Sequence, residues 1–252
     1  MKLSKTIGTY PAFTNDPVTV SLGDGVYSAE ETGIARQQRD EYFRDPSDAT
    51  YMRGLWSRFV GPAGAAELAS RLDFRQFKKL GDIGGVPFYQ AVVILSRFPH
   101  LSALLTDYDA MAIDALRRVP LLSSRELAVF DVKRDDLNLF ADCDVLTMWG
   151  VDCVLSDEDI GRVVRLGKTL IIGADRRATV FRGLLTRALY SKAGTKLRTL
   201  LRGPRQPVRR HGQFRTGSYL RGLIMEHGGH IAHEWLFLDY RLLVVTPPSS
   251  LR

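Results

Sequence analysis

Three aspartates stand at the ends of three successive segments that have the pattern of β-strands. Asp82 comes just before Gly84 and Gly85, and Asp107 and Asp131 end the next two segments. Glycines at a strand-to-helix turn let the backbone approach a ligand closely, and a carboxylate ending the next strand can accept both hydroxyls of a ribose. Each acid alone is more often a solvated turn residue or a helix cap. Together, at one edge of a parallel sheet, they predict a nucleoside site.

The order of the elements supports such an edge. From Phe77 onward short apolar runs alternate with helical patterns, which is typical of a parallel sheet with crossover helices. The predicted strands are Lys79–Ile83, Ser102–Asp107, Glu126–Asp131, Asp144–Trp149, Lys168–Gly173, Ile231–Leu238 and Tyr240–Thr246. The predicted helices are Pro87–Phe98, Ala110–Arg118, Asp157–Arg165 and Tyr219–His227. Ser156 and Asp159 have the spacing of a capping box. The last two strands are joined by almost no residues, so they must be antiparallel.

The first part of the chain has a different pattern. Turn signals there accompany three predicted helices: Ala29–Phe43, Ala49–Val60 and Gly64–Leu72. In the third helix the apolar residues have the spacing that lines one helical face. We therefore expect an N-terminal helical cap over residues 1–76, which contributes to the substrate region. An α/β domain over 77–252 follows, with a basic insertion at 176–215.

From Lys79 to Thr246, about two thirds of its length, the chain resembles a class I S-adenosylmethionine-dependent methyltransferase, as a divergent member. The residues that carry the resemblance are the glycine turn after Asp82, the strand-end acids and the closing pair of strands. The resemblance implies a Rossmann-like α/β fold with a seven-stranded sheet, mostly parallel with an antiparallel last strand. Helices would cover both faces, and the helical cap would be an N-terminal extension. S-adenosylmethionine is the implied cofactor.

The same resemblance assigns eight residues to the cofactor: Asp82, Gly84, Gly85, Asp107, Tyr108, Asp131, Val132 and Trp149. The first three would surround the methionine moiety, and the aspartate at 107 would bind the ribose hydroxyls. The next three would lie around the adenine, and the tryptophan would line the cleft shared by cofactor and substrate. The chain departs from the family motif at Val86, where a further glycine is expected.

Methyl transfer requires the alignment of two reactants and, for a hydroxyl acceptor, a base that removes its proton. Many small-molecule O-methyltransferases carry His-Asp-Trp in the region that 151–159 resembles, but this segment contains no histidine. Asp152, which follows the fourth strand, is the first candidate for the base. His227 and His230 are further catalytic candidates, with His233 beside them. The spacing of these histidines matches no single helical or strand face, so no metal site is predicted.

The net charge of +7 is unevenly distributed. Between Asp175 and Glu226 there are 13 Lys and Arg and no acid, which leaves 22 bases against 28 acids elsewhere. The insertion is predicted to contain an amphipathic helix over Phe181–Leu189 and a short helix over Leu197–Leu201. It is interpreted either as a lid with solvated arginines or as a surface for an anionic partner. The partners weighed are a phosphorylated or acidic sugar, the inner leaflet of a membrane and, ranked last because few aromatics are interleaved, nucleic acid.

Composition limits the classes of protein to which the chain can belong. A hydrophobic content of 45% over 252 residues is enough for a large core and excludes a disordered chain. No apolar run approaches the roughly 20 residues of a transmembrane helix, and no signal-peptide h-region follows the N-terminus. Cys143 and Cys153 are interpreted as reduced core residues. We expect a cytoplasmic protein, with peripheral contact at the inner membrane face and homo-oligomer formation left open.

Three functions fit these observations. The leading hypothesis is a methyltransferase acting on oxygen of a polar, anionic small molecule or a saccharide. The second is a catalytically degenerate binding or assembly module with the same fold, favoured by the departure at Val86 and the missing histidine. The third, a nicotinamide-dependent oxidoreductase, shares the strand-end acid but fits less well, because the acid before the glycines and the closing pair of strands are both typical of the methyltransferases instead.

Overall fold

The computed structural model describes residues 8–9, 40–57, 60–152, 154–175, 213–215, 217–237 and 240–247. The two helices predicted in the insertion, Phe181–Leu189 and Leu197–Leu201, lie outside the described residues. Of the predicted helix Ala29–Phe43, only residues 40–43 are described, and they belong to a helical turn over 40–44. No helix in the described ranges combines the length and apolar character needed to span a bilayer.

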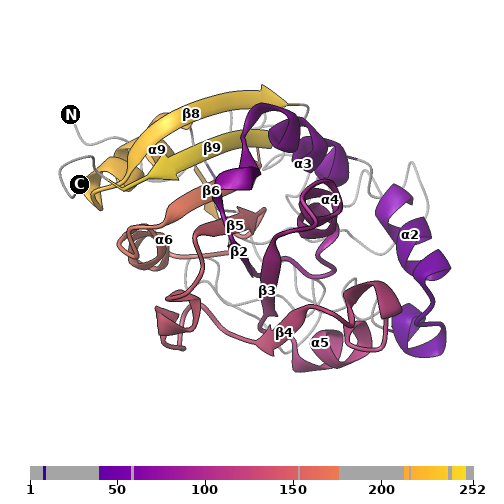
Figure 1. Ribbon diagram of the computed structural model, residues 1–252. Coiled ribbons are helices and arrows are strands. Elements are labelled where there is room, and N and C mark those ends of the chain that lie inside the picture. The colour runs from indigo at the N-terminus through magenta and orange to yellow at the C-terminus, as the bar shows by residue number, and fades with distance from the viewer. Residues whose placement is uncertain are drawn as a thin grey trace, which may run out of the picture.

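Seven strands form one sheet in the order β4-β3-β2-β5-β6-β9-β8 (Figure 1). Their bounds are β2 (Lys79–Ile83), β3 (Ser102–Asp107), β4 (Glu126–Val129), β5 (Val145–Trp149), β6 (Thr169–Asp175), β8 (His230–Phe237) and β9 (Tyr240–Thr246). β2 to β6 are parallel to one another, and β9 is antiparallel to both of its neighbours, β6 and β8. Only β9 therefore runs against the other six strands, which confirms the predicted sheet.

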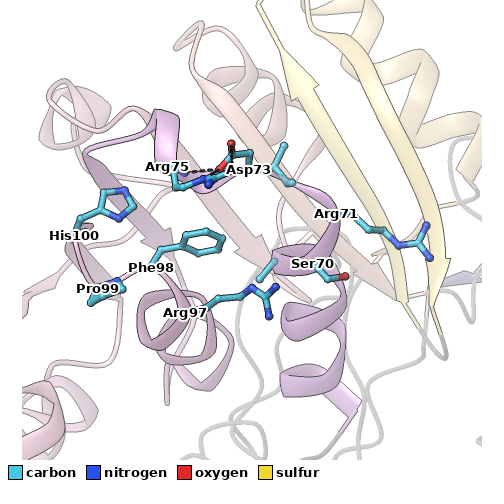
Figure 2. Close-up of a pocket in the computed structure, with 10 residues that line it drawn as sticks. Ser70, Arg71, Asp73, Arg75, Arg97, Phe98, Pro99 and His100 are labelled. Carbon is cyan, nitrogen blue, oxygen red and sulfur yellow. Dashed lines mark hydrogen bonds and ion pairs between the residues drawn. The ribbon is translucent and has the colours of Figure 1, made fainter.

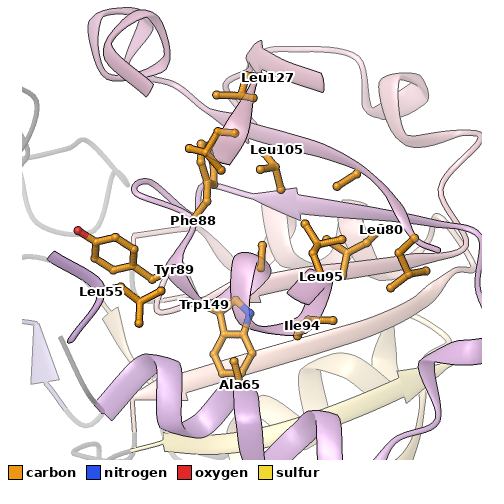
Figure 3. Close-up of a cluster of buried hydrophobic side chains, with 14 of the residues drawn as sticks. Leu55, Ala65, Leu80, Phe88, Tyr89, Ile94, Leu95, Leu105, Leu127 and Trp149 are labelled. Carbon is orange, nitrogen blue, oxygen red and sulfur yellow. The ribbon is translucent and has the colours of Figure 1, made fainter. Parts of the chain in front are cut away.

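Helices cover both faces of this sheet, as predicted. On one face lie α2 (Asp48–Ser57), α3 (Val60–Arg71), α4 (Tyr89–Arg97), α5 (Ala110–Leu116) and the short η2 (Pro120–Leu122). Their apolar side chains pack with those of the strands into one buried cluster (Figure 3). On the other face lie η3 (Leu137–Phe140), α6 (Asp157–Val164) and α9 (Gly217–Glu226), which bury a second cluster. The N-terminal helices α2 and α3 thus share a core with the sheet.

Local capping explains where two of these helices begin. The Ser156 side chain accepts a hydrogen bond from the Asp159 amide, and the Asp159 carboxylate accepts one from the Ser156 amide. This is the predicted capping box at the start of α6. Asp109 caps α5 by accepting hydrogen bonds from the amides of Met111 and Ala112. Both caps follow strands of the parallel sheet, so they fix the loops at its carboxyl edge.

Several predicted boundaries were wrong, including the following three. β4 ends at Val129 instead of Asp131, because the chain enters a turn there. α3 begins at Val60, which was assigned to the preceding helix, instead of at Gly64. α4 begins two residues later than predicted, because Phe88 at its N-cap has a φ of 65°, outside the helical region.

A second, two-stranded sheet was not predicted at all. β1 (Gly8–Thr9) pairs antiparallel with β7 (Gln213–Phe214), so a segment near the N-terminus lies beside the end of the basic insertion. Two-residue strands carry no periodic pattern, and their pairing spans most of the chain length. Another 3-10 helix, η1 (Phe74–Gln76), precedes β2 and is capped by the Asp73 side chain.

Candidate functional site

Asp82 and Asp107 lie together at the carboxyl edge of the sheet. Asp82 is on β2, where it pairs in register with Leu105 of β3 and Thr147 of β5. Asp107 is the last residue of β3. The two carboxyl groups are close enough for the charge of Asp107 to contribute to the raised pKa of Asp82. The structure thus brings together the first two predicted acids at the edge where open α/β sheets bind ligands.

The Asp82 side chain is buried, and only one of its two carboxyl oxygens has a hydrogen-bond partner among the described residues. The residue is 1% exposed, and its Oδ1 accepts a hydrogen bond from Thr147 Oγ1 at 2.5 Å. Its Oδ2 is buried and has no hydrogen-bond partner among the described residues. Burial raises the pKa of Asp82 to about 7, against the lowering effect of the Thr147 hydrogen bond. A buried polar atom without a partner is costly, and it marks a place where a ligand can supply the missing hydrogen bond.

The turn after β2 depends on its two glycines. Gly84 has a φ of 67°, a conformation that side chains with a Cβ rarely adopt, and its amide donates to the Thr106 carbonyl at 2.8 Å. A Cβ added to Gly85 would overlap Asp82 Oδ2, so any larger residue there must displace the carboxylate. Helix α2 supports the far side of the turn, where the Tyr51 hydroxyl donates to the Pro87 carbonyl at 2.7 Å.

Asp107 connects this turn to the loop after β3. Its Oδ2 accepts a hydrogen bond from the Val86 amide at 3.3 Å, and its Oδ1 accepts one from the Asp109 amide at 3.0 Å. The residue is 6% exposed, and burial raises the pKa of its carboxyl group to about 6 despite these hydrogen bonds. Tyr108 follows it and is half-buried. Asp107 is therefore oriented by backbone groups of both loops at this edge.

Asp131 and Val132 reach the same edge but are engaged differently. Asp131 Oδ1 accepts a hydrogen bond from the Lys133 amide at 3.0 Å, and Oδ2 lies 3.5 Å from the Arg134 guanidinium. Its carboxylate therefore stabilises its own turn. The Val132 side chain is buried in the core cluster on the α6 face. Of the three strand-end acids, Asp131 is thus the one with charged and backbone partners in its own loop.

Trp149 and Asp152 mark the end of β5 at this edge. The Trp149 ring packs so closely on β6 that a Cβ added to Gly173 would overlap it, and the ring centroid is 6.0 Å from that of Tyr240. The indole Nε1 is buried without a hydrogen-bond partner in the described part of the chain. Asp152, 4% exposed, follows in the loop before α6. Both residues therefore lie at the same edge of the sheet as Asp82 and Asp107.

His227 and His230, the further catalytic candidates, lie at the opposite edge of the sheet from Asp82 and Asp107. His227 follows the end of α9, and its Nδ1 is 2.7 Å from Nη1 of Arg165 at the end of α6. His230 pairs with Thr246, next to the start of β6. The amino ends of the parallel strands meet there, so neither histidine can reach a ligand held by the carboxylates. As histidines they were candidates for proton transfer, but only the direction of the chain through α9 shows at which edge of the sheet they lie.

Arg215 is a residue that sequence reasoning missed. In the sequence it was counted as part of the basic insertion. In the structure its side chain is fully buried and forms an ion pair with Asp157 at 2.7 Å. It also donates to backbone carbonyls of the loop that carries Asp152. Its position at the end of a run of arginines hid this role, because no local pattern distinguishes a buried arginine from a solvated one.

A pocket of about 670 Å³ at the amino edge is a separate feature (Figure 2). It lies between the ends of α3 and α4 and is lined by three arginines, each of which stabilises a neighbouring part of the fold. Arg75 is ion-paired with Asp73 at 2.9 Å, and Arg71 lies 5.7 Å from the Trp235 ring, directed toward the β8–β9 hairpin. Arg97 is in the last turn of α4, where a cation offsets the negative end of the helix dipole. This pocket does not contain the predicted cofactor residues.

Comparison with known proteins places the fold. No protein-family model and no curated protein matches the sequence. Among solved structures, human N-acetylserotonin methyltransferase in complex with SAM has a TM-score of 0.59 at 15% identity, covering 88% of this chain and 61% of that one. The mitomycin 7-O-methyltransferase MmcR has a TM-score of 0.56 at 16% identity, and the match covers 85% of this chain and 67% of that one. The dimethyltransferase RosA from Streptomyces davawensis has a TM-score of 0.53 at 19% identity, and the match covers 80% of this chain and 57% of that one.

The chain has the fold of class I S-adenosylmethionine-dependent methyltransferases. It spans between 57% and 67% of the length of these three structures. Within the methyltransferase fold, the glycine turn and the two buried carboxyl groups stand at the sheet edge that binds ligands in α/β proteins. A shared fold does not carry an activity with it, so function is argued from these residues.

Proposed function

We propose that the chain binds S-adenosylmethionine at the carboxyl edge and transfers its methyl group to a small acceptor. The observation that carries the proposal is the pair of buried carboxyl groups, Asp82 and Asp107, on neighbouring strands around the Gly84–Gly85 turn. Both have raised pKa values because they are buried, and Asp82 Oδ2 has no hydrogen-bond partner among the described residues. Carboxyl groups kept in this state are typical of sites that a ligand completes.

The residues present fit this cofactor. Asp107, already oriented by two amides, would accept the ribose hydroxyls, and Asp82 would face the cationic methionine end. The glycines leave room for close approach of the backbone. When bound, the cofactor supplies a methyl group activated by its sulfonium. The protein then has to hold the acceptor in line and accept its proton. Asp152, on the loop after β5, is the residue proposed to accept that proton.

For the acceptor, we propose an oxygen of a polar, anionic small molecule or a saccharide. The charge distribution supports an anionic acceptor, because the segment between Asp175 and Glu226 carries 13 bases and no acid. The three structural neighbours are named for small-molecule acceptors: mitomycin, N-acetylserotonin and 8-amino-8-demethyl-D-riboflavin. A small acceptor is consistent with a chain whose described helices pack closely onto the sheet.

A second candidate is a binding or assembly module that keeps the cofactor site without catalysis. Val86 and Pro87 stand where the family motif has a further glycine, and the loop after β5 has no histidine. These departures affect chemistry more than fold, because the sheet and its helices are intact. The two candidates therefore agree on cofactor binding and differ on methyl transfer.

Cofactor binding is tested first, by calorimetric titration with S-adenosylmethionine, S-adenosylhomocysteine and nicotinamide nucleotides. We expect the two adenosyl compounds to bind and the nicotinamide nucleotides not to bind. Asp107→Asn should weaken S-adenosylhomocysteine binding by about 10-fold to 100-fold, the value of a hydrogen bond to a charged group. Asp114→Asn, on the exposed face of α5, is the matched control and should leave binding unchanged. Failure of the wild type to bind either adenosyl compound would refute the proposal.

Catalysis is tested by transfer of a labelled methyl group from S-adenosylmethionine into a small-molecule extract. We expect the wild type to label an acceptor and Asp152→Ala to lose that label while still binding S-adenosylhomocysteine. Cofactor binding by the wild type without transfer to any acceptor would favour the non-catalytic module.

A further inference from the structure

Arg215 is a fully buried cation close to the site. Its side chain is 0% exposed, and it stands directly after β7, at the end of the basic insertion. Charged side chains are almost never fully buried unless they are paired. Contacts with one short segment, the loop between β5 and α6 together with the first residue of α6, satisfy all three nitrogens of the Arg215 guanidinium. The guanidinium must therefore be part of how that loop is held.

The contacts use all three nitrogens of the guanidinium. Nε donates to Asp157 Oδ1 at 2.9 Å, Nη2 donates to the Leu155 carbonyl at 2.8 Å, and Nη1 donates to the Asp152 carbonyl. The Tyr219 hydroxyl donates to the other oxygen of Asp157 at 2.5 Å, which fixes that carboxylate in turn. The planar fork of arginine reaches a carboxylate and two carbonyls from three separate nitrogens, whereas the three donors of a lysine converge on one nitrogen and cannot reproduce this geometry.

The loop held in this way forms a wall of the glycine turn. A Cβ added to Gly84 would lie 3.0 Å from Val151 Cγ2, so the Val151 side chain packs directly on the turn. Val151 precedes Asp152, whose carbonyl is one of the Arg215 acceptors. The Gly150 amide donates to the Gly173 carbonyl at 2.8 Å and fixes the other end of the loop to β6. A shift of the loop at Asp152 would therefore move Val151 away from Gly84.

We propose that Arg215 is a positioning residue: it sets the loop after β5 (residues 150–152 and 154–156) against the glycine turn, and so tunes cofactor affinity and orients Asp152. The inference rests on the proposed function, because it concerns the same site. It also gives the basic insertion a physical link to that site, since Arg215 is its last residue. In this proposal Arg215 acts through its contacts with the loop.

The test is S-adenosylhomocysteine affinity, measured by calorimetry at a temperature where each variant is folded. Arg215→Lys keeps the charge but loses the fork, and should weaken binding about tenfold, as expected when one charge-assisted contact is lost. Val151→Ala removes the contact with Gly84, leaves the clamp in place and should weaken binding in the same direction. Arg165→Lys is the control, because it makes the same change in an exposed arginine that is ion-paired with Glu158 away from the glycine turn, and it should change affinity less than about twofold.

Combining the substitutions separates positioning from simple loss of stability. If Arg215 acts through Val151, the double variant should lose less affinity than the two single effects added together. Additive losses would overturn the inference, as would unchanged affinity in Arg215→Lys or in Val151→Ala, even if the melting temperature falls. A wild-type protein that does not bind S-adenosylhomocysteine would instead refute the proposed function, and the inference would fall with it.

Discussion

Ionisable side chains at the two edges of the same sheet have opposite environments. At the carboxyl edge, Asp82 and Asp107 are buried, and burial raises both pKa values, to about 7 and about 6. At the amino edge, Lys79 is ion-paired with Asp142 at 2.7 Å and Glu126 at 3.0 Å. Its hydrogen bonds raise the pKa of Lys79 and lower that of Asp142, so both charged forms are favoured.

This difference separates a stabilising edge from the edge that carries the proposed site. Charges at the amino edge are satisfied by the protein itself, and Asp144 there also accepts hydrogen bonds from the amides of Lys78 and Lys79. At the carboxyl edge, one oxygen of the buried Asp82 carboxyl group has no hydrogen-bond partner among the described residues, at a cost to folding. Substitutions at one edge should therefore change stability, and substitutions at the other should change ligand affinity.

The largest effect is expected at Gly85. In Gly85→Ala the new methyl group would overlap Asp82 Oδ2 and displace the carboxylate. We expect S-adenosylhomocysteine affinity to fall about 100-fold, the upper end of the cost of overpacking, as measured by calorimetry. Gly222→Ala is the control, because nothing lies within 4 Å of its added methyl group in α9. Equal affinity in the two variants would contradict the importance of this turn.

Asp82→Asn should weaken S-adenosylhomocysteine binding and stabilise the ligand-free protein. Because the folded pKa of Asp82 is raised from 3.8 to about 7, its contribution favours folding at low pH and is lost as pH rises through about 7. At pH 8 the neutral amide should stabilise the ligand-free protein by about 1 kcal/mol and weaken S-adenosylhomocysteine binding about tenfold. Denaturant unfolding at several pH values checks this. A variant that retains the wild-type pH dependence between 4 and 7 would show that Asp82 is not its source.

Lys79→Met should have the reverse effect. Loss of the ion pairs with Asp142 and Glu126 should lower the free energy of unfolding by about 1 kcal/mol, the upper end for partly exposed pairs. S-adenosylhomocysteine affinity should stay at the wild-type value, because the site is at the other edge. Chemical denaturation and calorimetry on the same preparation measure both quantities. A large loss of affinity would show that the two edges are coupled.

The smallest effect is expected at His230. His230→Ala should leave both S-adenosylhomocysteine affinity and labelled methyl transfer unchanged, since the residue pairs with Thr246 at the amino edge. Asp152→Ala, measured in parallel, supplies the contrasting loss of transfer. If His230→Ala abolished transfer, the assignment of catalysis to the carboxyl edge would have to be reversed.

Much of the architecture could be predicted from local patterns in the sequence. Alternating strand and helix signals from Phe77 onward predicted the seven strands, and the short link before Tyr240 predicted the antiparallel pair. The Ser156 capping box was also predicted correctly, because it depends on residues three apart. Such features depend on contacts between neighbours in the chain, and these leave a signal in composition and spacing. Chain direction through a parallel sheet then placed Asp82 and Asp107 at one edge.

Features that depend on distant contacts could be read only from the folded chain. Residue type alone suggested His227 and His230 as bases, yet the path of α9 carries them to the far edge of the sheet. Arg215 looked like one more solvated arginine, and only its approach to Asp157, far away in the chain, buries it. Local patterns were enough to specify the strands, the glycine turn and the acids at the strand ends. Which charges are buried, paired or left for a ligand depends on packing between segments that are distant in the chain, and such packing leaves no local signal.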